Sequence, residues 1–552
     1  MPGVRIVFLG GLGEIGRNCF CLEVDGEIVV VDCGLMFPDP DMFGVDLVLP
    51  DFTYLRDRAA DVAGIVLTHA HEDHAGGLAF LLRDVSAPIY GSRLSLALAR
   101  RRIQEAGLVD RTDFVAVADG EVRRIGPVEA EFVPVTHSVP HAFAVAYRTP
   151  AGTILHTGDF KLDLTPVDGR TSDLARLAEI GEEGVRLLLS DSTNAERAGV
   201  TPSESTVGVT LRRLFEEHPA ERFIVASFAS HLHRVQQVAD AAIDAGRKVT
   251  LVGRSMVHNV AMGRELGALH IADDSIVDID EIARYEPGDV CVICTGSQGE
   301  PMSALSLMAA HEHKWVEVGD TDVVVLSAHA IPGNESNVDR VINALIRSGG
   351  TVVHDRTAPV HVSGHASSDE LRFMLSLARP EWFVPVHGEY RHLKAHARLA
   401  EGAGVPAGNV IVCEDGDALR LSTDGADVER RAVPAGFLYV DGIVGDVGHG
   451  VLRDRRNLAE EGLVVVFVTV DAQTGEIVTG PEIVTRGWVY EAEAEDLIED
   501  AKAAVRDSLR DATEEGATDF DTLRRHARRA LGRFIHERTR RRPAVIPVVM
   551  EV

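Results

Sequence analysis

The segment from Gly64 to Leu78 constrains the fold of this chain more than any other stretch. It begins with an apolar run, Ile65–Leu67, that indicates a buried strand, and after it the run Leu78–Leu82 indicates the start of a helix. Between the two runs lie three histidines and a carboxylate of the metal-ligating type: His69, His71, Asp73 and His74. This dense group predicts a functional site at the end of a strand.

The spacing of these residues predicts two neighbouring binding points. In an extended segment His69 and His71 point the same way, because side chains alternate with period two. Asp73 and His74 follow where the strand turns into the helix, and Asp73 is the expected N-cap residue. Imidazole and carboxylate ligands at two adjacent points suit a pair of divalent cations. The alternative is a polar loop whose histidines bond only water.

The glycines near the N-terminus imitate a dinucleotide-binding motif. Gly11–Gly16 fits the pattern G-x-G-x-x-G, and Asp32 lies near the position of a ribose-binding acid. Such a site needs a helix after the glycines. Here two strands around the Asp25-Gly26 turn are expected instead, which argues against NAD. We therefore expect the glycine loop to bring backbone close to a metal cleft, with Asp32 supporting a ligand.

Three further acids and histidines follow apolar runs in the first 205 residues, where short strands alternate with helices. His137 and Asp159 each stand at the tip of an expected strand, as His69 does, and Asp191 ends another. His141 and His156 are weaker candidates, since a lone histidine is more often structural.

The pattern of expected helices and strands changes between about 206 and 360. Longer helices are expected there, at Val207–Glu217, Leu232–Ala245 and Val338–Ser348. Two strands in this part end in small polar residues, near Ser230 and near Gly296, and such ends can offer N–H groups to anions. After 360 the pattern of the first 205 residues returns: His365 and His387 stand at the ends of apolar runs.

A Gly- and Asp-rich loop, 441–450, is expected to be a linker to a small α/β unit. The expected strands of this unit are 463–470, 476–489 and 544–551, and its expected helices are 491–511 and 518–539. The second helix and its end carry nine arginines: Arg524, Arg525, Arg528, Arg529, Arg533, Arg538, Arg540, Arg541 and Arg542. This helix presents an RNA-facing patch, a subunit interface or a solvated face.

Composition limits the class of protein. The length of 552 residues implies two to four domains. No apolar run approaches the ~18 residues of a membrane span. All six cysteines lie in or beside apolar runs, and we expect buried, reduced thiols even for the pair Cys291 and Cys294, which places the protein in the cytoplasm. The net charge of −30 argues against indiscriminate nucleic-acid binding but permits a local basic channel.

Taken together, these motifs resemble the metallo-β-lactamase superfamily and, within it, the β-CASP nucleases of the bacterial ribonuclease J type. The resemblance rests on the order of the motifs, on the run Ser363–Ser367, on the run Pro385–Arg391 and on the extra C-terminal domain. It implies an α/β fold: a metallo-β-lactamase αββα sandwich with an inserted β-CASP α/β domain and a small C-terminal α/β domain. The implied domain limits are 1–205 and 361–445 for the two parts of the metallo-β-lactamase domain with the linker, 206–360 for the β-CASP domain, and 446–552 for the C-terminal domain.

The resemblance also implies the roles of the site residues. One metal takes His69, His71, His137 and Asp159, and the other takes Asp73, His74, Asp159 and His387, so that Asp159 bridges them. Two Zn²⁺ ions are expected because imidazoles dominate, with Mn²⁺ or Mg²⁺ as possible replacements. Three residues carry implied catalytic roles: His365 outside the metal shell, Asp73 and Asp191.

A second implied site is a pocket for the RNA 5′ monophosphate. It matches Ser230, His231 and Leu232 together with His361, Val362, Ser363, Gly364, His365, Ala366 and Ser367. The implied activity is 5′→3′ exonuclease and endonuclease cleavage of RNA to 5′-phosphate products, in rRNA maturation and mRNA decay. The implied partners are RNA, preferably 5′-monophosphorylated, a second copy or three further copies of the chain, and other RNA-decay proteins, without a membrane.

Three other functions are compatible with the sequence. A DNA nuclease of the same branch is the nearest, since recognition of the 2′-hydroxyl leaves no readable motif. A small-molecule thioester or lactam hydrolase would not need the long insertion or His365. A non-catalytic scaffold would not need the complete set of ligands.

Overall fold

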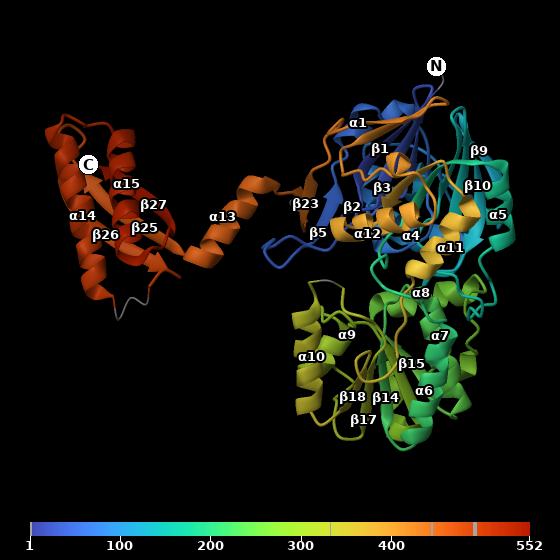
Figure 1. Ribbon diagram of the computed structural model, residues 1–552. Coiled ribbons are helices and arrows are strands. Elements are labelled where there is room, and N and C mark those ends of the chain that lie inside the picture. Colours follow the sequence, from blue (N-terminus) through green and yellow to red (C-terminus); the bar gives the residue numbers. More distant parts are fainter. Residues whose placement is uncertain (1–2, 332, 443–444, 490–493) are drawn as a thin grey trace. The chain divides into compact units, whose positions relative to one another are not determined.

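A computed structural model describes residues 3–331, 333–442, 445–489 and 494–552 (Figure 1). The chain forms two compact units, each described by itself below. The larger unit comprises Met1–Phe37 and Leu47–Leu438, and the smaller comprises Pro38–Asp46 and Tyr439–Val552.

The larger unit is built on two facing sheets. The first has eight strands in the order β22 (Ala426–Glu429), β21 (Ala418–Leu421), β1 (Val4–Gly10), β3 (Cys19–Val24), β4 (Glu27–Val31), β6 (Val62–Val66), β7 (Ile89–Gly91) and β8 (Phe114–Ala116). The second has six, in the order β19 (Trp382–Val386), β13 (Val185–Asp191), β12 (Gly152–His156), β11 (Ala142–Thr149), β10 (Val128–Val135) and β9 (Val122–Ile125).

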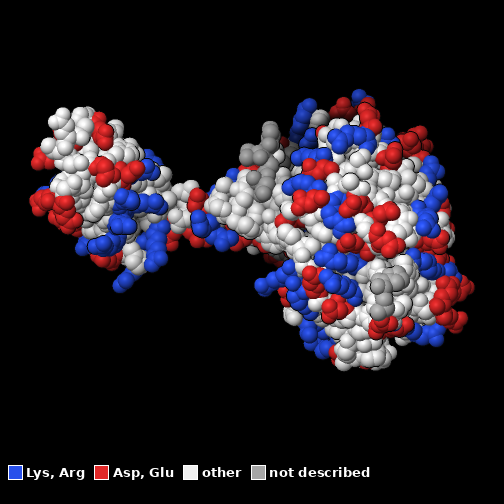
Figure 2. All heavy atoms as spheres, turned by 90° about the horizontal axis from the view of Figure 1, so that it is seen from above, with Lys and Arg blue, Asp and Glu red and all other residues white. Residues whose placement is uncertain are grey.

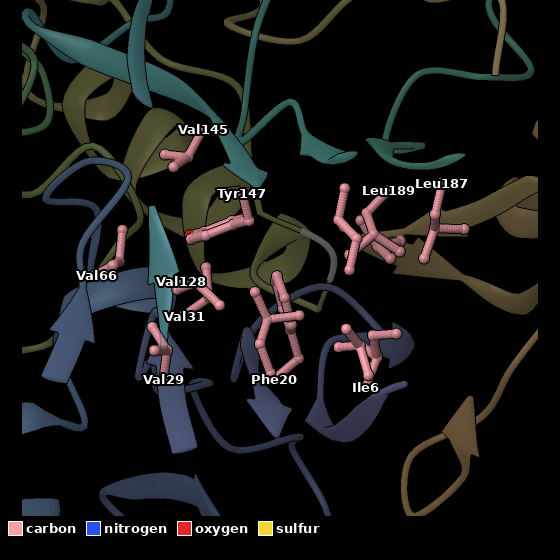
Figure 3. Close-up of a cluster of buried hydrophobic side chains, with 14 of the residues drawn as sticks. Ile6, Phe20, Val29, Val31, Val66, Val128, Val145, Tyr147, Leu187 and Leu189 are labelled. Carbon is pink, nitrogen blue, oxygen red and sulfur yellow. The ribbon is translucent and has the colours of Figure 1, made fainter. Parts of the chain in front are cut away.

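The inner faces of these sheets share one hydrophobic core (Figure 3). Val29 and Val31 point inward from β4, two residues apart, as strand alternation requires. Leu187 and Leu189 do the same from β13, and Tyr147 lies among them from β11. The core therefore locks the register of both sheets, and with it the positions at which their strands end.

Helices cover the outer faces and the sheet ends. They are α1 (Thr53–Asp57), α2 (Glu72–Ala75), α3 (Leu78–Leu81), α4 (Arg93–Glu105), α5 (Leu174–Glu183), α11 (Ser368–Ala378) and α12 (Tyr390–Gly402). The predicted sandwich of two sheets between helices is confirmed. As expected, β3 rather than a helix follows the glycine loop, and β3 and β4 are joined by the turn at Asp25 and Gly26.

An insertion leaves the six-stranded sheet after β13 and returns at β19. It holds a parallel sheet in the order β15 (Lys248–Val252), β16 (Val290–Cys294), β14 (Arg222–Ala226), β17 (Asp322–Leu326) and β18 (Thr351–His354). Five helices accompany it: α6 (Ser205–Glu217), α7 (Leu232–Asp244), α8 (Arg254–Glu265), α9 (Ala304–Ala309) and α10 (Glu335–Arg347). The strands are buried apolar runs, which is typical of a parallel sheet covered on both faces.

The smaller unit contains a three-stranded sheet and three helices. Its strand order is β26 (Ile477–Arg486), β25 (Leu463–Val470) and β27 (Ala544–Glu551), and its helices are α13 (Gly448–Glu461), α14 (Glu495–Glu514) and α15 (Phe520–Thr539). The three predicted strands and two of the helices are present. The first residues of the predicted helix 491–511 lie partly outside the described residues.

The predicted linker loop 441–450 was wrong at its end, because α13 begins at Gly448. Glycines at 448 and 450 disfavour a helix interior, but here they occupy its first turn, where the cost is small. The apolar contacts that follow come from Leu452.

All six cysteines are free and buried, as expected. Among the described residues, no helix is long and apolar enough to cross a bilayer.

Candidate metal centre

The first cluster of the site lies where three strands end. His69 and His71 follow β6, His137 follows β10, and Asp159 follows β12. His71 Nδ1 lies 3.1 Å from His69 Nε2 and 3.0 Å from His137 Nε2. Asp159 Oδ2 is 3.6 Å from His69 Nε2 and 3.7 Å from His137 Nε2. Four ligand-type atoms therefore converge on one point, as predicted for a metal.

A second cluster shares Asp159 with the first. His74 Nε2 lies 3.2 Å from Asp159 Oδ2, and His387 Nε2 lies 3.1 Å from Asp73 Oδ2. The potential ligand atoms of Asp73, His74, Asp159 and His387 all lie within 4.8 Å of one another. His387 directly follows β19 and has a φ of +53°, an uncommon conformation for a residue with a side chain. Asp159 is the residue common to both clusters.

Strand register explains why residues so distant in sequence meet. β12, β13 and β19 are parallel neighbours, with His156 beside Leu189 and Asp191 beside Val386. Their carboxyl ends lie at the same edge of the sheet, so Asp159, Asp191 and His387 emerge together.

The predicted N-cap was wrong. α2 begins at Glu72 with His71 as its N-cap, and no side chain caps it. His71 has extended backbone, and its carbonyl accepts hydrogen bonds from the N–H groups of His74 and Ala75. Asp73 therefore occupies the helix itself, and its carboxylate turns toward His387 instead of toward the backbone.

Hydrogen bonds on the far side of the imidazoles fix their orientation. His74 Nδ1 lies 2.8 Å from Asp32 Oδ2, and His137 Nδ1 lies 2.8 Å from the Gly364 carbonyl oxygen. Thr193 Oγ1 is 2.9 Å from His387 Nδ1. Such outer contacts hold metal-ligating histidines in one tautomer. The supporting contact predicted for Asp32 is present.

Asp32 also connects Thr68, which precedes the first histidine of the motif, to His74, the last one. It accepts hydrogen bonds from the Thr68 backbone N–H and from the Thr68 hydroxyl, both at 2.8 Å. Asn18, in the glycine loop, donates to the Asp73 carbonyl oxygen at 3.2 Å and lies 3.0 Å from His74 Nε2. The glycines thus bring backbone and Asn18 to the cleft, as expected, and Asn18 itself was missed because an asparagine carries no motif.

Burial sets the protonation of the first cluster. It lowers the pKa of His71 to about 4, and it lowers the pKa of His69 and of His137 well below the ordinary value, helped by the neighbouring imidazoles. These three rings are therefore neutral at pH 7, the form that binds metal ions. Burial opposes charge on His74 too, but Asp159, Asp73 and Asp32 outweigh it and raise the pKa of His74 well above its usual range.

Asp159 shows that the residues fit divalent cations. Both of its carboxylate oxygens are buried and have no hydrogen-bond partner among the described residues. Burial works against its charge, but His387, His74 and His69 hold its pKa well below the ordinary value. A buried carboxylate without hydrogen bonds is expensive unless a cation compensates it.

His365 stands beside these clusters. Its Nδ1 lies 2.8 Å from Asp191 Oδ2 and 3.9 Å from Asp159 Oδ2. Burial disfavours charge on the ring, but the Asp191 carboxylate outweighs this and raises the pKa of His365 to about 9. Asp191, His365, His387 and Asp159 also form a group close enough to hold an ion. The geometry therefore brings His365 beside Asp159, the carboxylate that the two clusters share.

The residues predicted to bind the RNA 5′ end differ in accessibility. Ser230 is partly exposed, whereas His231 is only 2% exposed and Leu232 lies in the core of the insertion. The His231 and Leu232 N–H groups donate to the Phe228 and Ser230 carbonyl oxygens. Of the three residues, Ser230 is thus the one whose side chain is most accessible to a ligand.

The segment from His361 to Ser367 divides in the same way. Ala366 is buried and its N–H donates to the Phe160 carbonyl oxygen, while Ser367 caps α11. His361, Val362, Ser363 and Gly364 lie before them, and His361 Nδ1 and His231 Nδ1 are both buried without a hydrogen-bond partner among the described residues. RNA contact by Leu232, Ala366 and Ser367 stays a prediction. In the structure Leu232 and Ala366 pack in hydrophobic cores and Ser367 caps α11.

The two weaker histidine candidates do not join the clusters. His156 is buried and packs edge-on against Phe20, and His141 is partly exposed near Arg170. Neither belongs to a potential metal-binding group among the described residues.

A buried polar network was also missed. Arg234 donates to both carboxylate oxygens of Glu204, at 2.8 and 3.1 Å, and to the Ser327 and Val360 carbonyl oxygens. The Glu204 N–H donates to Asp163 Oδ2 at 2.8 Å. This network links the insertion to the strand end that carries Asp159, and no short sequence pattern marks it.

Two facing sheets with histidines and carboxylates at one edge define the class as the metallo-hydrolases of the metallo-β-lactamase type. The model of the metallo-beta-lactamase superfamily matches residues 12–189, and that of the Zn-dependent metallo-hydrolase RNA specificity domain matches 352–412. The model of the ribonuclease J beta-CASP domain matches 220–345, and that of the ribonuclease J C-terminal domain matches 450–552.

Full-length relatives narrow the class. Ribonuclease J2 of Bacillus subtilis is 40% identical over 551 residues, covering 100% of this chain and 99% of the relative. Ribonuclease J of Mycobacterium tuberculosis is 44% identical over 552 residues, covering 100% and 98%. The chain belongs to the ribonuclease J family.

A solved structure shows the same fold at low sequence identity. The crystal structure of a protein of unknown function from Enterococcus faecalis has a TM-score of 0.54 and 17% identity, covering 76% of this chain and 100% of that one.

Proposed function

We propose that this chain is a metal-dependent ribonuclease that hydrolyses RNA from the 5′ end and also cuts internally, leaving 5′ phosphates. The observation that carries the proposal is Asp159: a buried carboxylate that has no hydrogen-bond partner among the described residues and belongs to two groups of ligand atoms, beside His365. The names of the relatives supply RNA as the substrate class. Action in rRNA maturation and mRNA decay, in the cytoplasm, completes the proposal.

The ligand roles follow from the two clusters. His69, His71, His137 and Asp159 would hold one divalent cation, and Asp73, His74, Asp159 and His387 the other. Bound there, the cations would activate a water molecule and neutralise the oxygens of the scissile phosphodiester. Imidazole ligation favours Zn²⁺, and Mn²⁺ or Mg²⁺ would be accepted by the carboxylates.

His365 would act on the substrate rather than on a cation. Asp191 holds its Nδ1, which leaves Nε2 for the RNA. A ring kept protonated by Asp191 can donate a proton to the leaving 3′ oxygen or stabilise charge on the phosphoryl oxygens. Asp191 would thus position His365, and Asp73 would turn its carboxylate from α2 into the reaction centre.

The 5′ end would bind at the crevice of the inserted sheet. The chain leaves β14 toward β15 on one side and leaves β17 toward β18 on the other, and ligands bind where such connections diverge. Ser230 and His231 follow β14, and Arg234 contacts both His231 Nε2 and the carbonyl oxygen of Val360, the residue before His361. A 5′ monophosphate there would make charge-assisted hydrogen bonds that a 5′ hydroxyl cannot make.

The domain limits belong to the same proposal: 1–205 with 361–445 for the metal-binding domain and its linker, 206–360 for the RNA-gripping insertion, and 446–552 for the C-terminal domain. Assembly into a homodimer or homotetramer, and association with other RNA-decay proteins, are proposed on the family resemblance.

One experiment tests the activity and the pocket together. RNA labelled internally and carrying a 5′ monophosphate, triphosphate or hydroxyl is digested, and the products are resolved by length. The monophosphate should be degraded fastest from the 5′ end. If none of the three RNAs is cleaved, the proposal of a ribonuclease is contradicted. If all three are cleaved at equal rates, the proposed recognition of the 5′ end is contradicted and an endonuclease remains.

The pocket has a matched pair of variants. Ser230→Ala should flatten the ranking of the three RNAs while internal cleavage continues. Ser376→Ala is the control, because the Ser376 hydroxyl is exposed and donates to Arg372 within its own helix. Equal loss of both activities in Ser230→Ala would assign Ser230 to the fold or to the catalytic cleft.

A further inference from the structure

The C-terminal unit carries a groove whose charge is opposite to that of the whole chain. The groove has a volume of about 760 Å³ and lies between α13, α15 and the start of β27. Arg528, Arg533, His536 and Arg542 line it, and Asp454 is the single acid in its lining. Lys and Arg gather on one part of this unit's surface, while Asp and Glu gather on another (Figure 2).

The arginines of the groove are available to a ligand. Arg528, Arg533 and Arg542 are exposed, and none of their guanidinium groups forms an ion pair with a described residue. Neighbouring arginines differ: Arg538 pairs with Asp500, and Arg541 pairs with Glu461. Arginines whose charge is not compensated inside the protein are suited to binding phosphate groups.

We propose that this groove binds the sugar-phosphate backbone of single-stranded RNA through residues other than those proposed to cleave it. The inference rests on the proposed ribonuclease function, because that function makes RNA the polyanion that the chain meets. With a net charge of −30, the chain as a whole repels RNA, so a local basic groove provides a place of capture.

The lining also indicates how the RNA is held. It contains no Phe, Tyr or Trp among the described residues, so bases have no stacking platform there. Binding through phosphates alone is independent of sequence and strongly dependent on salt.

The test compares two double variants of the full chain. Arg528→Gln/Arg533→Gln changes the groove, and Arg506→Gln/Arg510→Gln removes the same charge from exposed positions of α14. The probe is a 3′-fluorescein-labelled oligouridylate of about 30 nucleotides with a 5′ hydroxyl, long enough for several phosphate contacts. Its Kd is measured by fluorescence anisotropy in EDTA at several KCl concentrations, so that no cleavage occurs.

The groove variant should bind this RNA several-fold more weakly at low salt, and the slope of log Kd against log salt should fall by about 1.4, for two lost contacts at ~0.7 each. The control should keep the affinity and slope of the parent. Equal weakening in both variants would overturn the groove in favour of general charge, and unchanged binding in the groove variant would overturn it outright.

Two further measurements separate this inference from other failures. Cleavage of a five-nucleotide 5′-monophosphorylated RNA should be equal in all three proteins, since the groove takes no part in the chemistry. If none of them cleaves it, the proposed function fails while the binding result still stands. A shift of the groove variant to smaller species in light scattering, with RNA affinity unchanged, would assign the groove to a second copy.

Discussion

At the scale of single residues, Asp159 is notable because its carboxylate is buried between two groups of potential metal ligands. It is 1% exposed, and its carboxylate lies 3.6 Å from His69 Nε2 and 3.2 Å from His74 Nε2, one imidazole from each proposed ligand set. No other residue is shared by the two proposed ligand sets, so its loss should be felt at both.

Asp159→Ala should therefore lose metal at both points and lose ribonuclease activity with it. Elemental analysis of the purified protein gives the metal content per chain. Glu196→Ala is a suitable control, because the ion-pair partners of Glu196 among the described residues are exposed Arg391 and His392, and neither is a proposed metal ligand. Two metals per chain in Asp159→Ala would contradict the shared-ligand assignment.

For His365 we expect the opposite effect on metal content. If it acts on the RNA and not on a cation, His365→Ala should keep its metals and still bind RNA, while turnover falls by roughly 10²-fold or more. Metal analysis and single-turnover cleavage check the two halves separately. Loss of a metal ion would place His365 among the ligands, as its closeness to His387 and Asp159 allows.

At the scale of elements, the sequence predicts what depends on local pattern. The ends of β6, β10 and β12 follow from apolar runs and were correct, and α6 and α7 of the insertion were found to within two residues. The predicted start of α10 was three residues late, and α8 and α9 were not named. The predicted N-cap of α2 was wrong because the side chain of Asp73, a residue that often caps helices, faces the cleft, and His71 takes the N-cap position instead. The N-cap preference of Asp therefore did not decide where the helix begins, because the Asp73 carboxylate is placed in the cleft.

Contacts between distant segments could not be predicted in this way. The hydrogen bond between His137 and the Gly364 carbonyl oxygen joins residues 227 positions apart, and the Glu204–Arg234 pair depends on the packing of α7 against the chain before α6. Nothing in either segment alone specifies its partner. The motif histidines were found because ligand chemistry requires particular side chains, whereas a supporting carbonyl can belong to any residue.

The Glu204–Arg234 pair provides a prediction at this scale. Both side chains are almost fully buried, and removing one partner leaves the other charge buried alone. Arg234→Met and Glu204→Leu should each lower the free energy of unfolding by ~3–5 kcal/mol, and the double variant by less than the sum. Urea denaturation of the four proteins measures this coupling.

The pH dependence of the pair has a definite sign. Burial opposes the Glu204 charge, but Arg234 and His231 outweigh it and hold the pKa of Glu204 well below its ordinary value. Its contribution is thus complete above the unfolded pKa of ~4.3 and is lost as the pH falls through the folded pKa. Glu204→Leu should lack that loss. Arg212→Met, which breaks the exposed pair with Asp244, is the control and should cost at most ~1 kcal/mol.

At the scale of the whole molecule, the order of the motifs predicted the two-sheet sandwich with its insertion. Each motif follows a strand, and the same order of strands and motifs is typical of the metallo-β-lactamase sandwich. The long interval between Asp191 and His365 required an insertion, and the parallel sheet β14–β18 fills it. The C-terminal unit contributes no residue to the potential metal-binding groups among the described residues.

One face of the C-terminal sheet suggests assembly. Val464, Val466 and Val468 of β25 are buried on one face of the strand, in the cluster shared with α14 and α15. Phe467 points to the opposite face, as strand alternation requires, and it is 37% exposed, while Met550 of β27 is 48% exposed. An apolar sheet face left in water favours association with another surface.

Truncation of the chain near Gly445 removes this face together with α13, α14 and α15. The shortened protein should keep the metal content of the parent, because all proposed ligands precede residue 388, and it should form smaller species in solution. Light scattering coupled to size-exclusion chromatography measures the mass, and elemental analysis measures the metals. Phe467→Lys in the full chain is the sharper variant: it should also reduce the oligomer, since a charge on the sheet face opposes its burial. An unchanged mass in both proteins would mean that the C-terminal unit does not hold the oligomer together.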